Sequence, residues 1–174
     1  CYSLCNAPGD PLTITVKRTA DGYGSVWLVD NVVAADVLEV LPPAGRFTPR
    51  SLDGTFLLVA AGSGITPVLG ILRTILASGE GKMALFYANR DEQSVIFAAE
   101  LRRLTAKYPD RLTVLHWLES VSGLPTPASL APLLAPWASG AEAFLCGPAA
   151  FMAAADTGAT LILDAYGGAI NRLD

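Results

Sequence analysis

The chain has 174 residues, and its 12 Lys and Arg against 16 Asp and Glu give a net charge of −4. Charged residues make up 16% of the chain, against about 25% in ordinary soluble domains, while 52% are hydrophobic. This composition excludes a disordered chain, and the acidic balance argues against a nucleic-acid partner, since a nucleic-acid binder carries a basic patch. No apolar run reaches the roughly 18–20 residues that cross a bilayer, so we expect no membrane span.

The three cysteines, Cys1, Cys5 and Cys146, are odd in number and lack the spacing of a disulfide framework. The cysteines and the single His116 do not show the paired ligand spacing of a typical structural zinc or iron–sulfur site, so we predict no metal site. Reduced thiols favour a cytoplasmic protein. The chain opens without Met on residues that are typical of the middle of a strand, and we expect it to be part of a longer protein.

Residues 1–52 are rich in turns and in β-like patterns. Residues 12–17 alternate apolar and polar side chains with the period of a half-buried strand. After a turn, Ser25 is placed to cap a short helix over residues 26–29. A further short strand is expected over residues 37–40, ending before two prolines.

From residue 53 onward, continuously apolar segments alternate with segments of helical periodicity. Such apolar runs are typical of strands that are buried on both faces of a parallel sheet. The alternation predicts an α/β fold with a doubly wound parallel sheet and right-handed crossovers. The expected strands cover residues 56–61, 83–87, 112–117 and 143–146, and the expected helices cover residues 68–76, 94–107 and 129–134.

A glycine-rich turn joins the first buried strand to the following helix. Its glycines permit a tight turn and let backbone amides approach a ligand closely, and a proline is tolerated in the first helical turn. The helix N-terminus then offers free amides and its positive dipole end to a pyrophosphate. A proline replaces the third glycine of the full dinucleotide fingerprint, and a tight turn without a ligand is the alternative. The turn consists of Gly62, Ser63, Gly64, Ile65, Thr66 and Pro67.

Two further segments follow predicted strand ends at the same edge of the sheet. The segment Cys146-Gly147-Pro148 follows the last strand, with a small buried hydrophobic residue as the alternative interpretation of its cysteine. The segment Asn89-Arg90-Asp91 follows the second strand, where the ribose of an adenosine would lie. Asp91 or Glu92 is suited to accept hydrogen bonds from ribose hydroxyls and to repel a 2′-phosphate, whereas Arg90 would attract one. A solvated loop is the alternative.

Near the N-terminus, Tyr2 offers an aromatic face and Ser3 offers a small hydroxyl and an amide to a ligand. Gly24-Ser25 opens a helix and repeats the arrangement that suits an anion. Each of these signals is weak alone, and a purely structural role is the alternative. His116 and the three tryptophans are interpreted as packing residues.

Taken together and in this order, the motifs resemble the ferredoxin–NAD(P)⁺ reductase family over residues 1–152. Tyr2-Ser3 is similar to the tail of the family's R-x-Y-S flavin motif, whose Arg would fall one residue before Cys1. The resemblance implies that FAD is bound by Tyr2, Ser3, Leu4, Val16, Lys17, Gly24 and Ser25. It implies that NADH is bound by Gly62, Ser63, Gly64, Ile65, Thr66, Pro67, Asn89, Arg90, Asp91, Cys146, Gly147 and Pro148, with Asp91 favouring NADH over NADPH. Ser3 and Cys146 would then stand beside the reacting rings as the catalytic positions.

Residues 87–91 and 107–120 are similar to the subfamily of reductases that serve actinobacterial 3-ketosteroid hydroxylases in steroid degradation. This resemblance implies FAD, NADH and a C-terminal [2Fe-2S] domain, whose ligands are not present in this sequence. The electron acceptor would be a Rieske-type oxygenase or a ferredoxin. We therefore divide the chain into part of an antiparallel FAD-binding β-barrel (1–52), an α/β NAD(P)-binding domain (53–152) and a divergent tail (153–174) without the subfamily's final strand.

The function that these expectations favour is hydride transfer from NADH to FAD, followed by electron transfer to an acceptor protein. Two alternatives remain open. One is a nucleotide-binding remnant or regulatory electron-transfer subunit without turnover of its own. The other is the reductase module of a flavohaemoprotein-like or phenol-hydroxylase-like system, which shares the motifs and differs in its acceptor.

Overall fold

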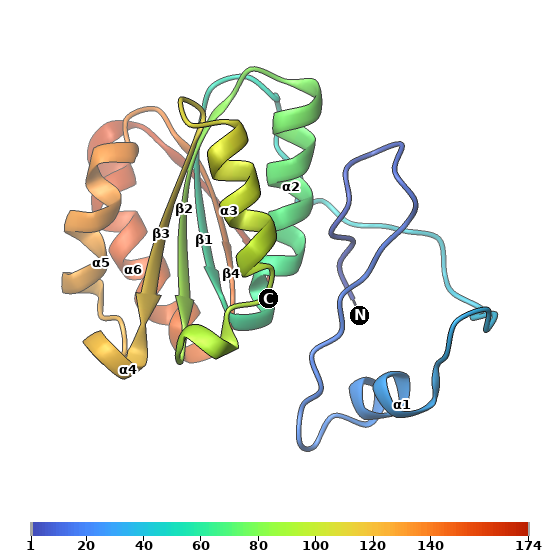
Figure 1. The fold of residues 1–174 in the computed structure, drawn as a ribbon. Helices are drawn as coiled ribbons and strands as arrows, with labels where there is room; N and C mark the ends of the chain where they lie inside the picture. Colours follow the sequence, from blue (N-terminus) through green and yellow to red (C-terminus); the bar gives the residue numbers. More distant parts are fainter. Residues whose placement is uncertain (1, 174) are drawn as a thin grey trace.

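The computed structural model describes residues 2–173, which are built around one parallel sheet (Figure 1). The strand order is β3-β2-β1-β4-β5, and each neighbouring pair runs parallel. The doubly wound sheet is thereby confirmed, with the four expected strands in place and one strand more at its edge. The strands are β1 (Thr55–Ala61), β2 (Lys82–Asn89), β3 (Leu112–Leu118), β4 (Glu142–Cys146) and β5 (Ala169–Leu173).

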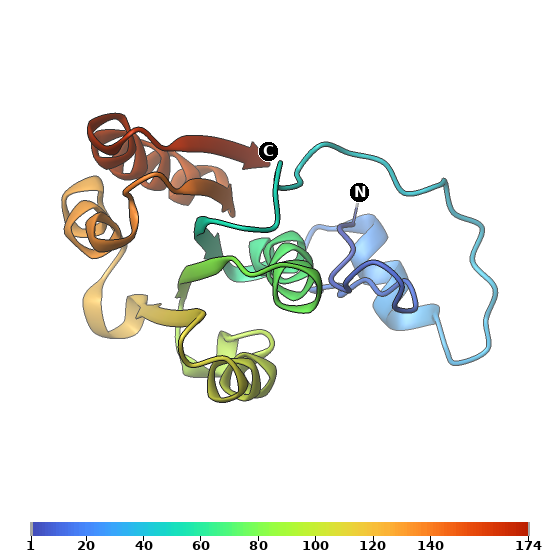
Figure 2. The ribbon, with the colours of Figure 1, turned by 90° about the horizontal axis from the view of Figure 1, so that it is seen from above.

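Helices cover both faces of this sheet, α2 and α3 on one side and α5 and α6 on the other (Figure 1). A further helix, α1, lies in the N-terminal segment, away from the sheet (Figure 2). The α-helices are α1 (Tyr23–Asn31), α2 (Ile65–Ser78), α3 (Ala98–Lys107), α4 (Glu119–Ser122), α5 (Pro127–Leu134) and α6 (Ala149–Tyr166). Short 3-10 turns are η1 (Gly62–Gly64), η2 (Glu92–Ser94) and η3 (Ala135–Trp137). None of the helices within residues 2–173 combines the length and apolar character needed to cross a membrane.

Strand β1 divides the core into two halves because its side chains alternate across the sheet. Phe56 and Leu58 pack with α2 and α3, whereas Leu57 and Val59 pack with α5 and α6. All four are at most 2% exposed. A strand buried on both faces needs an unbroken apolar sequence, which is the pattern that identified it.

Helix α3 is shorter than its periodicity predicts. The expected helix starts at residue 94, but the structure begins it at Ala98, after Phe97 in a left-handed conformation with φ 62°. Upstream, the Asp91 side chain accepts from the Ser94 amide and caps η2. The cap and the left-handed residue interrupt the helical path, so the preceding residues form a loop instead.

The expected boundary at residue 152 does not coincide with a structural break. Helix α6 passes through Met152 and continues to Tyr166, and β5 then pairs in parallel with β4. Residues 153–173 therefore extend the α/β domain and are not a separate tail. Gly167 ends α6 with φ 71°, a left-handed C-terminal cap of a common kind.

The expected barrel portion in residues 1–52 is not formed. In the described part of this region, only one antiparallel bridge, between Leu4 and Ile14, stands where residues 12–17 were expected to form a strand. Residues 37–40 are irregular, and Val37 is 94% exposed. A strand is stabilised by a ladder of neighbours, and an alternating sequence without such neighbours stays extended and unpaired. Helix α1 is present but begins at Tyr23, so Ser25 lies inside it and Gly22 is the capping residue.

The start of the N-terminal segment nevertheless packs against the α/β domain. Cys5 is 1% exposed and belongs to the apolar core on the α2 side of the sheet. Its amide donates to the Thr13 carbonyl oxygen at 2.9 Å, which holds the two arms of this segment together. Viewed from above, the segment lies beside α2 (Figure 2).

Candidate functional site

The candidate site lies at the carboxyl ends of β1 and β4. Strand order runs outward from β1 in one direction through β2 and β3, and in the other through β4 and β5. The crossovers on the two sides lie on opposite faces of the sheet, so a crevice opens where the order reverses. The turn after β1 and the segment after β4 both reach this point, as the sequence predicts for two nucleotide-binding motifs.

The two motifs meet backbone to backbone at Gly64. A Cβ added at Gly64 would overlap the carbonyl group of Cys146 and lie 2.8 Å from the amide nitrogen of Gly147. A Cβ added at Gly147 would lie 2.8 Å from the Phe151 ring and 3.1 Å from the Ala61 side chain. Both glycines are therefore required by close packing, and together they form a floor of bare backbone between β1 and β4.

Tyr87 holds the first glycine of the turn. Gly62 adopts φ 53°, a left-handed conformation that suits glycine, and its carbonyl oxygen accepts from the Tyr87 hydroxyl at 3.0 Å. Burial raises the pKa of Tyr87 to about 12, so the hydroxyl remains a donor. The sequence places Tyr87 at the end of the second strand but does not show this hydrogen bond, because the bond depends on a contact between β2 and η1.

The N-terminus of α2 faces the crevice with its first amides uncapped by any side chain. The positive end of the helix dipole favours an anion there, although the Ile65 amide already donates within η1 and Pro67 has no N–H. Pro67 lies in the first turn, and the Thr66 hydroxyl donates to the Ser63 carbonyl oxygen at 3.0 Å. Ser63 is exposed, whereas Ile65 is fully buried and anchors the helix in the core.

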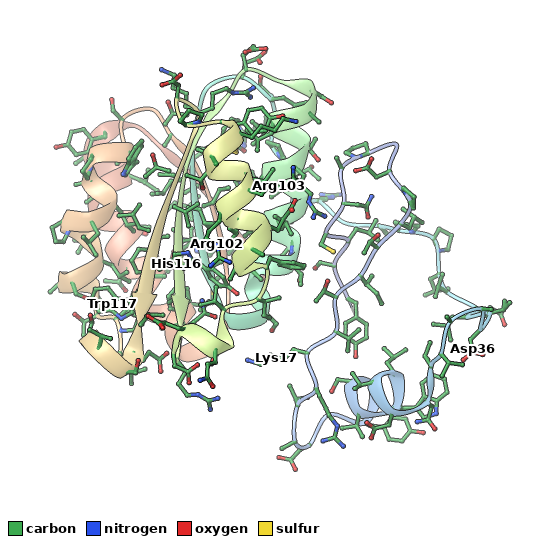
Figure 3. The ribbon with its side chains drawn as sticks, in the orientation of Figure 1. Lys17, Asp36, Arg102, Arg103, His116 and Trp117 are labelled. Carbon is green, nitrogen blue, oxygen red and sulfur yellow. The ribbon has the colours of Figure 1, made fainter. Side chains whose placement is uncertain are left out.

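Lys17 supplies a positive charge beside this turn. Its Nζ lies 3.8 Å from the position that a Cβ on Gly62 would take. Figure 3 shows the side chain pointing from the N-terminal segment toward the α/β domain. The resemblance assigned Lys17 to FAD, and the structure brings it to the pyridine-nucleotide motif.

A hollow of about 430 Å³ opens next to Lys17, between the N-terminal segment and the loop that follows β2. This volume is within the range of about 300–1,000 Å³ of small-molecule sites. It unites residues that the sequence assigned to two different ligands. The lining residues are Thr15, Val16, Lys17, Arg90, Asp91, Gln93, Ser94 and Ile96.

The acidic group of this hollow is fixed and charged. One oxygen of Asp91 accepts from the amide and hydroxyl of Ser94 at 2.8 and 2.5 Å, and the other accepts from Arg90 at 3.3 Å. The hydrogen bonds from Ser94, followed by the pairing with Arg90, lower the pKa of Asp91. A second hollow, of about 290 Å³, adjoins it and is lined by Asp91, Glu92, Gln93, Leu118, Ser120 and Val121.

Asn89 is a buried amide at the end of β2. The residue is 4% exposed, and neither its Oδ1 nor its Nδ2 has a hydrogen-bond partner within the part of the chain that the structure describes. Buried polar groups in native proteins are nearly always paired. Because the amide lies one residue before Arg90, its missing partner belongs to the same end of the sheet as the hollow.

The flavin motifs come together on the N-terminal segment. The Tyr2 hydroxyl lies 3.6 Å from the position that a Cβ on Gly24 would take, so the two motifs are neighbours. The Ser25 hydroxyl is already bonded, to the Thr19 hydroxyl at 2.8 Å and to the Gly22 carbonyl oxygen at 3.1 Å. An exposed aromatic ring therefore lies beside the first turn of α1, and the bonded Ser25 hydroxyl is not free to act as a donor. Ser3 and Leu4 are half-buried beside them.

The thiol of Cys146 stays protonated at neutral pH. Cys146 ends β4 as a free thiol, and burial raises its pKa to about 11. Pro148 follows as the residue that precedes α6. Cys5 is also a free thiol, whereas Cys1 lies outside the described residues. Within residues 2–173 there is no group of three or more ligand-type side chains that would hold a metal ion.

Known proteins are similar to this chain over most of its length. The family model described as the oxidoreductase NAD-binding domain matches residues 58–157. The chain is 63% identical over 154 residues to the ferredoxin reductase component of 3-ketosteroid-9-alpha-monooxygenase of Rhodococcus rhodochrous, covering 87% of this chain and 44% of that protein. The component of the same name from Mycobacterium tuberculosis is 57% identical over 157 residues, covering 89% and 44%. The chain thus spans less than half the length of these relatives.

Among solved structures, phthalate dioxygenase reductase is similar along nearly the whole chain. The TM-score is 0.76 at 26% identity, covering 98% of this chain and 52% of that protein. That protein is described as a modular structure for electron transfer from pyridine nucleotides to [2Fe-2S].

Proposed function

The chain belongs to the oxidoreductase NAD-binding domain family, and on that premise we propose that it binds NADH for a flavin-dependent reductase that supplies electrons to an oxygenase. The observation that carries the proposal is the bare-backbone contact of Gly64 with Cys146 and Gly147 at the carboxyl ends of β1 and β4. Backbone without side chains lets a flat, charged dinucleotide approach the sheet edge closely. The names of the relatives support the reductase role.

The pyrophosphate of the nucleotide binds at the start of α2. The positive dipole end of the helix attracts its oxygens, and Lys17 neutralises part of their charge. Lys17 comes from the N-terminal segment, so this contact draws the two parts of the chain together around the ligand.

The adenosine half extends toward the loop after β2. Asp91 is held in its charged form and accepts from the ribose hydroxyls, while Asn89 supplies a nearby amide that has no other partner. A 2′-phosphate would meet the Asp91 charge, so NADH is preferred over NADPH. Because Arg90 is already paired with Asp91, its charge is partly cancelled.

FAD is the group that fits the N-terminal side, where Tyr2, Ser3, Leu4, Val16, Gly24 and Ser25 would hold it. Bound there, FAD would supply the capacity to accept a hydride from the nicotinamide and to pass on single electrons, which is chemistry that no side chain supplies. Ser3 and Cys146 exclude water and pack beside the rings, and with its raised pKa Cys146 stays a neutral thiol.

The acceptor we propose is a Rieske-type oxygenase or a ferredoxin in a cytoplasmic system of steroid degradation, reached through a [2Fe-2S] group. Two features support it: the names of the relatives and the modular description of phthalate dioxygenase reductase. A second candidate is a nucleotide-binding subunit without turnover. The absence of a barrel ladder in residues 2–54 favours it, because the flavin then has only one side of its site.

Nucleotide titration of the purified chain tests the proposal. We expect NADH to bind and NADPH to bind at least tenfold more weakly. In Asp91→Asn, we expect the affinities for the two nucleotides to become more similar. The control is Asp110→Asn, an exposed acidic residue away from the hollow. Equal affinities in the parent chain would reject the role of Asp91, and no binding of either nucleotide would reject the proposal. Flavin absorbance and NADH:ferricyanide turnover then separate the two candidates, since the non-catalytic subunit binds nucleotide without turnover.

A further inference from the structure

Two residues on one face of α2 contact the segment that carries Tyr2 and Ser3. Gly70 and Arg73 are three positions apart on the helix and therefore lie one above the other. The Arg73 Nη1 donates to the Cys5 carbonyl oxygen at 2.6 Å. A Cβ on Gly70 would lie 2.8 Å from the carbonyl oxygen of Leu4.

The glycine is explained by this contact. Gly70 is the buried central residue of a 14-residue helix, where alanine would be the more stable choice. A methyl group would fill the space that the Leu4 carbonyl occupies, so only a glycine lets the N-terminal segment lie directly on the helix. Gly70 therefore weakens the helix slightly but allows the Leu4 carbonyl to approach it closely.

The second terminal nitrogen of the Arg73 guanidinium is held by a residue of α3. Arg73 Nη2 donates to Glu100 Oε1 of α3 at 3.2 Å, and the same carboxylate accepts from Arg103 at 2.9 and 3.0 Å. The side chains of Arg73 and Glu100 are 28% and 22% exposed. A guanidinium with both ends engaged has a fixed orientation, so Arg73 presents its donor to Cys5 in one geometry.

We propose that Gly70 and Arg73 form a clamp that fixes the position of Tyr2-Ser3 relative to the nucleotide turn. The helix that carries the clamp begins at Ile65, inside the turn itself, and transmits position as a rigid element. Arg73 is then a positioning residue that touches neither ligand. This inference rests on the proposed function, because its consequence is the alignment of two bound nucleotides. Reacting atoms must approach to about 3–3.5 Å, and a displacement of about 1 Å can cost on the order of 100-fold in rate.

Four variants test the clamp. Arg73→Met removes the donor and keeps the length, and Arg73→Lys keeps one charged donor. Gly70→Ala adds the methyl group, and Arg102→Met is the control, an exposed arginine on α3 (Figure 3). For each we measure hydrogen exchange of residues 2–8, NADH affinity, thermal unfolding, and the limiting rate of flavin reduction by NADH at saturating FAD.

The expected pattern separates positioning from binding and from folding. In Arg73→Met, exchange of residues 2–8 rises, the NADH dissociation constant stays within about threefold, and the limiting rate falls by about tenfold or more. Arg73→Lys recovers part of the rate, and Arg102→Met resembles the parent chain. Gly70→Ala increases exchange of residues 2–8 without lowering the unfolding temperature, because alanine favours the helix.

Other outcomes overturn the clamp or the proposed function separately. Unchanged exchange in both Arg73→Met and Gly70→Ala overturns the clamp. Increased exchange with a parental rate overturns its positioning role, and a loss of NADH affinity matching the loss of rate assigns Arg73 to binding instead. If the parent chain does not bind NADH, or does not bind FAD, the proposed binding of that nucleotide is wrong. Hydrogen exchange of residues 2–8 then tests on its own whether Gly70 and Arg73 hold the N-terminal segment.

Discussion

Gly64 and Cys146 are packed so closely that a Cβ at position 64 would overlap the carbonyl oxygen of Cys146. The contact joins the end of β1 to the end of β4, two strands that are paired in register from Phe56 to Ala60. It defines the floor of the crevice, and every residue other than glycine at position 64 would have to displace the segment that follows β4.

Gly64→Val is expected to abolish NADH binding. The valine side chain forces apart the backbone of Gly64 and the segment 146–148, and with it the amides that would face the pyrophosphate. We expect the affinity to fall at least 100-fold, equivalent to about 2.8 kcal/mol. Fluorescence titration measures the affinity, and circular dichroism checks the fold. Ala106→Val, which introduces a valine on the exposed face of α3, is the control, and parental affinity in Gly64→Val would reject the assignment.

Asn89→Leu is expected to stabilise the fold and weaken NADH binding. Removing a buried amide without partners recovers desolvation free energy, which we expect to raise the free energy of unfolding by about 1 kcal/mol. The matched control is Asn171→Leu, because the Asn171 amide donates to Glu142 and to the Ala143 carbonyl oxygen. Losing these hydrogen bonds should lower the free energy of unfolding. Urea unfolding measures the free energy of unfolding, and NADH titration measures the affinity. A destabilised Asn89→Leu would show that the amide has a structural partner.

Cys146 is expected to resist alkylation at neutral pH. With its pKa raised to about 11 by burial, only about one thiol in a thousand is ionised at pH 8, and the thiolate is the reactive form. Iodoacetamide labelling followed by peptide mass spectrometry should show slow modification that rises about tenfold per pH unit up to pH 10. Rapid labelling at pH 7 would contradict the assignment of a neutral thiol. Cys146→Ala is expected to retain NADH binding.

Glu100 is expected to make the fold sensitive to acid. Hydrogen bonds from Arg103 and then from Arg73 lower the pKa of Glu100 below that of the unfolded chain, which is about 4.3. Its stabilising contribution is therefore complete above that value and is lost as the pH falls through the lower pKa of the folded state. The unfolding temperature should fall less steeply between pH 6 and pH 3 in Glu100→Gln than in the parent chain. Parallel curves would show that the network does not stabilise the fold.

Most of the sheet could be predicted from the sequence because its strands are buried on both faces. Residues 56–61 and 83–87 are continuously apolar, and that pattern leaves little choice of structure. The length of helix α6 beyond residue 152 and the strand β5 were missed although a local signal exists, since Gly167-Gly168 follows an apolar helical segment and is typical of a helix end. The N-terminal strands were predicted wrongly because their alternation says nothing about whether partner strands are present.

The site divides in the same way. The turn at Gly62–Gly64 and the segment 146–148 carry their signal in their own residue types, and the structure brings the two predicted motifs into contact. Tyr87, Gly70 and Arg73 carry none, because each acts through a carbonyl oxygen in a distant part of the chain. Sequence patterns report local periodicity, whereas these roles arise from tertiary contacts.

The strand order has a kinetic consequence. Strands β1 and β2 are joined by a short crossover, whereas β1 pairs with β4 through Phe56 and Glu142, about 85 residues apart, and closing so long a loop costs more entropy. We expect the half of the sheet formed by β1, β2 and β3 to assemble before β4 docks. The contact between Gly64 and Cys146 then appears only at the end of folding, and a partly folded chain does not display the nucleotide crevice.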